Sequence, residues 1–372
     1  MPPLYRICTR CVMDSSDPEI IFDAEGVCNH CKKYEANVKR FVFPGGLGSK
    51  KLEAIVKSIK SEGEGKEYDC VIGVSGGVDS SYTAYLVKKA GLRPLAVHLD
   101  NGWNSELAVK NVERLLRKLE IDLYTHVLDW EEFKSLQLAF LRASTPDSEI
   151  PSDHAIVSIL YEKAKELGLR YIIPGTNIKT ESHLPRAWSQ GHRDWLYIKS
   201  INDQFGTRKL ESFPHYTFMN NIFRQRNYRW VPILNYVDYV KFESIKILEN
   251  ELGWKYYGGK HYESIYTRFY QGYILPKKFG YDKRRSHLSS LICSGETTRT
   301  NALKELETNP YPPDMMETDK TFFLNKFGLT EQQFKEIMDA PPMRFQDYSS
   351  YEKKYVNTFW FQLLKRIYRS MR

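Results

Sequence analysis

Long apolar runs are missing from this sequence, and so is any recognisable targeting segment. No stretch approaches the ~20 consecutive apolar residues that a membrane-spanning helix requires. Residues 1–10 lack the apolar core of a secretory signal peptide. Internal repeats and low-complexity tracts are absent as well. We therefore expect a cytoplasmic protein without a transmembrane segment.

The composition is that of a globular chain with two or three modules. Its 372 residues can bury a full core, with 42% hydrophobic and 27% charged residues. The formal net charge of +8, from 54 Lys and Arg against 46 Asp and Glu, favours anionic ligands. Charge alone does not separate a nucleotide from a nucleotide sugar or an RNA.

The phosphate-binding pattern G-x-x-x-x-G-K-[ST] is also absent, but a different glycine-rich turn is present. The segment SGGVDSS, at 75–81, follows the apolar run 70–74 and precedes a helical pattern at 82–89. Adjacent glycines let backbone N–H groups approach an anion closely, because no Cβ intervenes. Asp79 and Ser80 then open the helix, whose positive N-terminus faces the same anion. A generic turn between a strand and a helix is the alternative.

The order strand, SGGxDS and helix resembles the pyrophosphate loop of the ATP pyrophosphatases, which split ATP into AMP and pyrophosphate. This resemblance implies that ATP and Mg²⁺ bind here. Ser75, Gly76, Gly77 and Ser80 would hold the β- and γ-phosphates and leave the α-phosphorus open to a nucleophile. Asp79 would orient Mg²⁺ or the loop itself, which makes Ser75 and Asp79 the candidate catalytic residues.

Strand and helix patterns alternate from residue 70 to residue 173, which is typical of an α/β domain with a doubly wound parallel sheet. In such sheets ligands bind beyond the carboxyl ends of the strands. The expected strands are 70–74, 94–99, 123–128 and 171–173, and the expected helices are 78–89, 106–119, 130–141 and 155–167.

The residues just after each strand are therefore candidate ligand contacts. Gly175 and Thr176, after the fourth strand, are placed to approach ATP. Asp100, after the second strand, either holds the nucleoside or caps the next helix. Glu181 either helps to hold Mg²⁺ or lies exposed, and for Asp153 we favour a helix N-cap over a catalytic role.

Four of the six cysteines form two pairs, Cys8-x-x-Cys11 and Cys28-x-x-Cys31. Two pairs of this spacing place four thiolates around one structural Zn²⁺, the pattern of a zinc ribbon. A module of this size has little core, so metal binding would supply most of its folding free energy, on the order of 10–16 kcal/mol. Turn-forming residues between the pairs favour a small β-hairpin. The alternative is a pair of redox dithiols.

Aromatic and cationic side chains are mixed throughout residues 260–300. Such a segment can stack on a nucleotide or a sugar and bind its phosphate or carboxylate groups. Arg268, Lys278 and Arg285 are the leading candidates for substrate contact. The alternative is a solvated basic face whose aromatic side chains belong to the core. A final amphipathic helix, at 355–372, is expected to pack on the protein itself rather than on a membrane.

These signals divide the chain into three expected parts. A zinc ribbon covers 1–42, an ATP pyrophosphatase domain covers 43–258, and a basic, aromatic and mainly helical region covers 259–372. The glycine-rich stretch 43–49 is expected to be a linker, followed by a helix at 50–61.

With these parts assembled, the chain resembles the N-acetyl sugar amidotransferases of bacterial surface-polysaccharide and flagellin-sugar biosynthesis. The resemblance covers nearly the whole chain and implies that an acetamido group of a nucleotide-activated sugar, as in lipopolysaccharide O-antigen synthesis, becomes an acetamidino group while ATP is converted to AMP and pyrophosphate. It rests on CTRCVMD at 8–14, GVSGGVDSS at 73–81, IPSDHA at 150–155, GTN at 175–177, and HYES at 261–264 through KR at 283–284.

A nucleophile for glutamine hydrolysis is missing from the sequence. Outside the two pairs, the cysteines are Cys70, which lies in an expected strand, and Cys293, which lacks a G-x-C-x-G pattern. Residue 2 is Pro2 rather than a terminal cysteine. We therefore expect a separate protein to supply ammonia. The resemblance implies a partner pair similar to the glutaminase and cyclase subunits of histidine biosynthesis.

Two other functions compete with this interpretation. A tRNA-modifying enzyme, either a thiolase or a lysidine-type ligase, could share the loop, the zinc ribbon and the basic surface. Thiolases need further cysteines near the nucleotide, and a third CxxC is missing here, so we expect no nucleic-acid partner. A non-catalytic zinc-ribbon adaptor with a vestigial nucleotide fold is disfavoured by the intact SGGVDSS.

Overall fold

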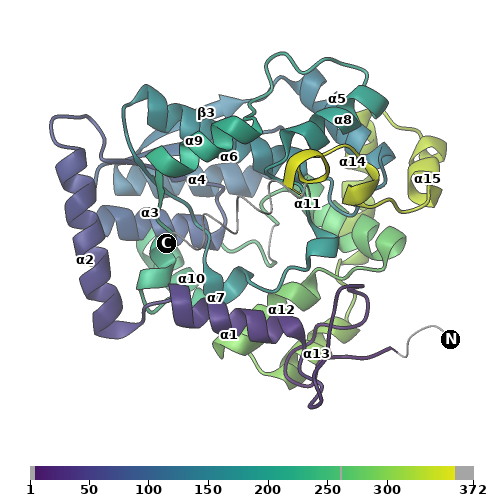
Figure 1. The fold of residues 1–372 in the computed structure, drawn as a ribbon, viewed down its shortest axis with the longest axis horizontal. Helices are drawn as coiled ribbons and strands as arrows, with labels where there is room; N and C mark the ends of the chain where they lie inside the picture. Colours follow the sequence, from purple (N-terminus) through teal and green to yellow (C-terminus); the bar gives the residue numbers. More distant parts are fainter. Residues whose placement is uncertain (1–4, 260–261, 357–372) are drawn as a thin grey trace.

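A five-stranded sheet lies at the centre of the computed structural model, which describes residues 5–259 and 262–356 (Figure 1). All neighbouring strands run parallel, in the order β3-β2-β1-β4-β5. The expected α/β class is confirmed. The edge strand β5 is only two residues long and was not expected from the sequence. The strands are β1 (Cys70–Gly73), β2 (Pro94–Asp100), β3 (Asp122–Val127), β4 (Tyr171–Ile173) and β5 (Arg229–Trp230).

Helices cover both faces of this sheet. The helices up to the end of the sheet region are α1 (Asn29–Phe41), α2 (Gly45–Glu62), α3 (Val78–Lys89), α4 (Glu106–Leu119), α5 (Trp130–Arg142), α6 (Ile150–Glu166), α7 (Ile178–Glu181), α8 (Trp195–Phe205), α9 (Phe218–Asn227) and α10 (Lys241–Leu252). The later ones are α11 (Ile265–Phe269), α12 (Arg284–Ser294), α13 (Arg299–Glu307), α14 (Pro313–Phe327) and α15 (Glu331–Asp339), with a π-helical segment at Tyr270–Phe279.

The side chains of β1 point alternately into two separate halves of the hydrophobic core. Val71 packs into a cluster with α5, α6 and α8, whereas Cys70 and Ile72 pack into a second cluster with α3, α4 and α10. Successive side chains of a strand point to opposite faces, so both faces of β1 are buried. This is the doubly wound arrangement expected from the sequence.

The aromatic side chains after residue 262 belong to the core of the sheet domain. Tyr266, Phe269 and Phe323 are almost fully buried. Tyr266 and Phe323 pack against Trp103, which follows β2, and Phe269 packs against Phe323. These three aromatic side chains therefore belong to the core, which was the alternative to stacking on a ligand. The region from α11 to α15 is therefore joined to one face of the sheet by apolar packing.

The N-terminal segment lies along the lower edge of the view in Figure 1, beside α12 and α13. Instead of the expected hairpin, it contains two isolated antiparallel bridges, Ile7 with Asp14 and Phe22 with Cys28. The expected linker at 43–49 is also wrong, because α2 begins at Gly45. A Cβ on Gly48 would lie 1.9 Å from the carbonyl oxygen of Phe43. The glycine serves close packing at a helix start rather than flexibility.

Among the described residues, every helix is too short or too polar to span a bilayer. Most of the amphipathic helix expected at 355–372 lies outside the described residues.

We predict that Gly175→Ala destabilises the fold. A Cβ at Gly175 would lie 2.7 Å from the backbone nitrogen and the Cα of Ser80, so the segment after β4 would have to move away from α3. Overpacking of this kind costs about 1–3 kcal/mol. Urea unfolding followed by circular dichroism should show a lower midpoint. Gly46→Ala is the matched control, because a Cβ there meets nothing within 4 Å. Equal midpoints for the two variants would contradict the packing argument.

Candidate active site and metal centre

In the loop between β1 and α3, the chain reverses direction at one glycine that has a left-handed backbone conformation. Gly76 has φ +87°, a conformation that side chains with a Cβ rarely adopt. Its carbonyl oxygen accepts hydrogen bonds from Trp254 Nε1 at 2.9 Å and from the Tyr257 hydroxyl at 2.7 Å. These bonds fix the orientation of the peptide from outside the loop.

Hydrogen bonds of two serines within the loop also stabilise it. Ser80 Oγ accepts from the backbone N–H of Ser75 at 3.2 Å and lies 3.1 Å from Ser75 Oγ, which itself accepts from Gly77 N–H at 3.3 Å. Helix α3 then begins without a capping side chain, because its N-cap is Gly77. First-turn N–H groups of such a helix suit an anion such as a phosphate group.

Asp79 is held at the start of α3 by a buried tyrosine. The Tyr239 hydroxyl donates a hydrogen bond to Asp79 Oδ1, and Asn177 Nδ2 donates to the same oxygen at 3.5 Å. Burial and the negative charge of Asp79 both raise the pKa of Tyr239. The phenol therefore remains a hydrogen-bond donor, and Asp79 keeps a fixed orientation.

A cavity of about 640 Å³ opens beyond this loop, at the carboxyl ends of the strands. Asp79 and Glu181 both line it and offer the carboxylate oxygens that Mg²⁺ prefers. The loop donors and these carboxylates together suit a magnesium-bound triphosphate. Among the residues expected to bind ATP, the structure brings the following to the cavity wall: Ser75, Gly77, Asp79, Ser80, Gly175 and Thr176.

Two of the expected ATP contacts have other positions. Gly76 makes the turn itself and does not line the cavity. Asp100 also lies outside the lining, since its carboxylate accepts the backbone N–H of Gly102 at 2.8 Å. The N-cap of the next helix, α4, is Ser105, so Asp100 caps a turn and not that helix, and its contact with the nucleoside stays a prediction. Asn101, its neighbour, lines the cavity instead.

A cluster of three charged side chains, of which Asp147 is buried, occupies another part of the cavity wall. His192 Nε2 lies 3.4 Å from Asp147 Oδ2 and 3.3 Å from Asp153 Oδ2. Burial disfavours the charged imidazolium, but the two carboxylates outweigh it and raise the pKa of His192 to about 10. Burial likewise opposes the Asp147 carboxylate, yet His192 and Lys283 lower the pKa of Asp147 to about 2. Both groups are therefore charged at neutral pH.

The same wall contains a second buried ion pair. Lys283 Nζ lies 3.3 Å from Glu149 Oε2, which also accepts from Gln271 Nε2 at 2.7 Å. Burial opposes the lysine charge, but the carboxylates of Glu149 and Asp147 outweigh it and raise the pKa of Lys283.

Sequence reasoning missed most of this cluster. Asp153 was expected to be an N-cap, but the N-cap of α6 is Glu149, and Asp153 lies one turn inside with its carboxylate on the cavity. The available signal was the run of acidic residues at 147, 149 and 153 beside the basic residues at 283–285. The two runs are about 130 residues apart, so spacing alone could not pair them.

A second cavity, of about 470 Å³, adjoins the first. It extends between α10, α12 and α13, and Arg268 lines it. The Arg268 guanidinium is paired with Asp319, at 2.6 and 2.8 Å, so its charge is compensated. The two cavities share six lining residues: Lys241, Tyr256, Gly259, Gln271, Lys283 and His287.

The other two cations expected to contact substrate line neither cavity. Lys278 donates to the carbonyl oxygen of Ile337, and burial lowers its pKa to about 8. Arg285 pairs with Asp14 at 2.9 Å and donates to the carbonyl oxygen of Val12 at 2.8 Å. The structure gives both side chains packing partners instead of a place on the cavity wall.

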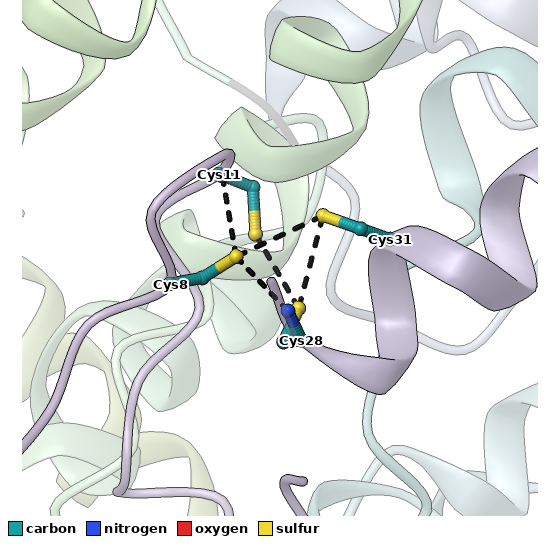
Figure 2. Close-up of side chains that lie close together, drawn as sticks. All are labelled: Cys8, Cys11, Cys28 and Cys31. Atoms are coloured by element: carbon teal, nitrogen blue, oxygen red, sulfur yellow. Dashed lines mark hydrogen bonds between the residues drawn. The ribbon is translucent and has the colours of Figure 1, made fainter. Parts of the chain in front are cut away.

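The four paired cysteines converge on one point, with all four sulfurs facing inward (Figure 2). Sγ–Sγ distances are 4.0 Å for Cys8 to Cys31, 3.7 Å for Cys11 to Cys28 and 3.7 Å for Cys28 to Cys31. Four sulfurs around a tetrahedral Zn²⁺ with Zn–S bonds of about 2.3 Å lie about 3.8 Å apart. All four side chains are fully buried, so the geometry suits a closed structural zinc site.

This cluster is attached to the later part of the chain. Arg299 donates to the carbonyl oxygens of Cys8 and Cys11 at 3.0 Å each, through Nη2 and Nε respectively. The backbone N–H of Val12 donates to Ser289 Oγ at 3.2 Å. The turn that carries the first cysteine pair is therefore held against α12 and α13.

Two stretches of the chain match described families. Residues 50–181 match NAD synthase, and residues 263–365 match the LPS biosynthesis protein WbpG-like, C-terminal domain. The first stretch contains the glycine loop, and the second contains Gln271, Lys283 and His287 of the cavity wall.

Individual proteins show similarity over different lengths. The uncharacterized protein MJ1599 of Methanocaldococcus jannaschii is 25% identical over 83% of this chain and 96% of its own length. The tRNA-specific 2-thiouridylase MnmA of Clostridioides difficile is 32% identical, over 36% of this chain and 40% of its own length. The NH3-dependent NAD synthetase of Campylobacter jejuni, a solved structure, has 16% identity and a TM-score of 0.31, covering 76% of this chain and 97% of that one.

The glycine loop at 75–81 is therefore a pyrophosphate loop, or PP-loop, and the domain that contains it belongs to the ATP pyrophosphatase superfamily. The chain is an ATP-using enzyme of the ligase or synthetase type. A WbpG-like C-terminal domain follows the PP-loop domain and contributes part of the cavity wall.

We predict that deprotonation of His192 lowers the free energy of unfolding as the pH rises above neutral. The pKa of His192 is raised to about 10 in the folded protein, against about 6.5 in the unfolded chain. Its contribution is therefore fully present below pH about 6.5 and is lost as the pH rises through about 10. Urea unfolding between pH 7 and 10 should show a shallower pH dependence for His192→Gln than for the wild type.

The matched control is His126→Gln, since burial lowers the pKa of His126 and this residue does not change charge over that range. It should keep the wild-type pH dependence. A His192→Gln profile parallel to the wild-type profile would contradict the assignment.

Proposed function

We propose that this enzyme is an ATP-dependent amidotransferase of lipopolysaccharide O-antigen or other surface-polysaccharide synthesis. Its substrate is a nucleotide-activated N-acetyl sugar, whose acetamido group it converts into an acetamidino group. The reaction consumes ATP and ammonia and releases AMP and pyrophosphate. The cytoplasm, where nucleotide sugars and ATP are available, is the expected location.

The observation that carries this proposal is the shared wall of the two cavities. One cavity begins at the PP-loop, and the other lies between α10 and the helices of the WbpG-like domain. Lys241, Gln271, Lys283 and His287 border both. An acceptor that occupies the second cavity can therefore extend a reactive group toward the triphosphate.

The chemistry explains why ATP is required. An amide carbonyl is a poor electrophile, so ammonia does not displace its oxygen unaided. Attack of the amide oxygen on the α-phosphorus of ATP forms an O–P bond and expels pyrophosphate, giving an adenylylated imidate. Ammonia then adds to the imidate carbon, and AMP leaves with the former amide oxygen. The remaining proton goes to a base or to water, and the product is an amidine.

The described residues supply the groups that these steps need. The PP-loop and the first turn of α3 would bind the β- and γ-phosphates, and Asp79 with Glu181 would hold Mg²⁺, which neutralises the departing pyrophosphate. Fixed donors of this kind act where charge develops. Asp153, with 53% of its side chain exposed on the cavity side, would accept the proton from ammonia.

Zn²⁺ has a structural role in this proposal. The closed four-cysteine site has no open coordination position for chemistry. Its contribution would be to stabilise the N-terminal module against α12 and α13.

We predict that Asp79→Asn removes most of the adenylylation activity while the protein stays folded. The amide keeps a carbonyl oxygen for the Tyr239 hydroxyl but loses the charge that would hold Mg²⁺. A loss on the order of 10²–10³-fold is expected, as for a single electrostatic contact in comparable sites. Exchange of labelled pyrophosphate into ATP, measured with acceptor sugar present, reports this step. Asp203→Asn, an exposed control, should exchange at the wild-type rate, and a near-normal rate in Asp79→Asn would refute the role of Asp79.

Ammonia is expected to come from a separate glutaminase, aided by a cyclase-like subunit. We predict that the purified chain uses ammonium salts but not glutamine as nitrogen source. Mass spectrometry of nucleotide-activated diacetamido sugars, incubated with ATP, should show replacement of oxygen by NH only with ammonium. Replacement by the single chain with glutamine alone would refute this prediction.

The second candidate function is modification of tRNA. It is favoured by the similarity to the tRNA-specific 2-thiouridylases, which covers about a third of this chain and 40% of the Clostridioides difficile protein. Retarded tRNA in a gel-shift assay, with steep salt dependence, together with no turnover of any nucleotide sugar, would favour this function over the first.

A further inference from the structure

A second group of metal-binding side chains lies directly beside the four-cysteine cluster. It consists of Cys31, which also belongs to that cluster, together with His183 and Cys293. Cys31 Sγ lies 3.8 Å from Cys293 Sγ, and Cys293 Sγ lies 3.6 Å from His183 Nε2. The three donor atoms all lie within 4.8 Å of one another.

These distances are those of ligands on one metal ion. Tetrahedral Zn²⁺ binds sulfur at about 2.3 Å and imidazole nitrogen at about 2.0–2.1 Å, which places two sulfurs about 3.8 Å apart and sulfur and nitrogen about 3.5 Å apart. The separations of Cys31 from Cys293 and of Cys293 from His183 agree with these values, and Cys31 Sγ lies within 4.8 Å of the His183 donor nitrogen. Six thiolates serve two ions in Zn₂Cys₆ modules, so sharing of a thiolate between zinc ions has precedent.

The hydrogen bonds around His183 also favour a metal. The Ser290 hydroxyl donates to the carbonyl oxygen of Ser286 at 3.2 Å, so its oxygen accepts the proton of His183 Nδ1, 3.0 Å away. His183 Nε2 then presents its lone pair to Cys293. The ring is fully buried and rests against Tyr34, with ring centroids 5.1 Å apart. A hydrogen bond that fixes the far nitrogen is the usual support of a metal-binding histidine.

Charge balance points the same way. Four thiolates around one Zn²⁺ leave a formal charge of −2 in a fully buried cluster. A Cys293 thiolate with a second Zn²⁺ reduces this to −1 and pairs the added thiolate.

We propose that Cys31, His183 and Cys293 bind a second Zn²⁺, bridged to the first through the thiolate of Cys31. The partly exposed position of Cys293 leaves room for water as the fourth ligand. This ion would join three parts of the chain. Cys31 lies in α1, Cys293 lies in α12, and His183 follows Ser182, the C-cap of α7. Since Ser286 and His287 of α12 line the first cavity, the second ion links the N-terminal module to the wall of the active site.

The test is the metal content of the full-length protein. The chain is purified under reducing conditions, saturated with Zn²⁺, freed of loose metal by gel filtration and measured by inductively coupled plasma mass spectrometry. Two ions per chain are expected for the wild type, and one per chain for Cys293→Ala and for His183→Phe, a twofold decrease. His183→Phe keeps an aromatic ring against Tyr34 while removing the donor nitrogen.

Controls separate this result from general damage. Cys70→Ala removes a buried thiol in β1, outside both groups, and should keep two ions. Substitution with Co²⁺ reports each site by its thiolate charge-transfer absorption, so a variant that keeps the four-sulfur spectrum has a folded first site. One ion in the wild type, whether or not the variants retain it, would overturn the proposal. In that case Cys293 and His183 form a thiol–imidazole hydrogen bond, or Cys293 replaces one of the four ligands.

Discussion

The shape of the cavity near the loop at 75–81 depends on two hydrogen bonds to the carbonyl oxygen of Gly76. Two donors, Trp254 Nε1 and the Tyr257 hydroxyl, hold it from the segment after α10, about 180 residues further along the chain. Gly76 is thereby fixed in its left-handed conformation, and the next residues open α3 toward the cavity. Trp254 is almost fully buried, so this support is itself fixed by the core. A loop that is rigid before ligand binding loses little entropy when a phosphate arrives.

The cavity combines two kinds of electrostatics on one scaffold. Near α3 the groups are backbone N–H donors and a helix terminus, which carry partial positive charge and suit phosphate. On another part of the wall are full charges in compensated pairs, His192 with Asp147 and Lys283 with Glu149. Paired charges keep fixed positions at low net charge, so in the proposed reaction this part would orient the sugar of the acceptor without attracting its phosphate groups strongly. Under the proposed function, this division would let one pocket distinguish the triphosphate from the sugar.

Local patterns predicted the parts of the fold that local forces determine. Alternation and turn residues placed β1, β2, β3 and β4 within two residues of their observed ends, and the paired cysteines identified a cluster that the structure brings together. Gly48 was misread as part of a linker because its role depends on tertiary packing, the close approach of α2 to the carbonyl oxygen of Tyr236 as well as to that of Phe43.

The cavity wall shows where sequence reasoning stops. Arg285 carries the same local signal as Lys283, yet it pairs with Asp14 while Lys283 pairs with Glu149 on the cavity. Which of two adjacent cations serves a site is decided by the helix face on which each lies and by acids far away in the sequence. Lys278 lies away from the cavity wall for the same reason, since its partner is a backbone carbonyl of α15.

The contacts of the N-terminal module have a consequence for synthesis of the chain. Val12 meets Arg285 across 273 residues, and Cys8 meets Arg299 across 291. At a translation rate of about 5–20 residues per second, the segment emerges from the ribosome roughly 15–60 s before these partners exist. During that interval the four thiols are without α12 and α13, against which the folded protein holds them. Early capture of Zn²⁺ would protect these thiols from oxidation and from mispairing until α12 and α13 arrive.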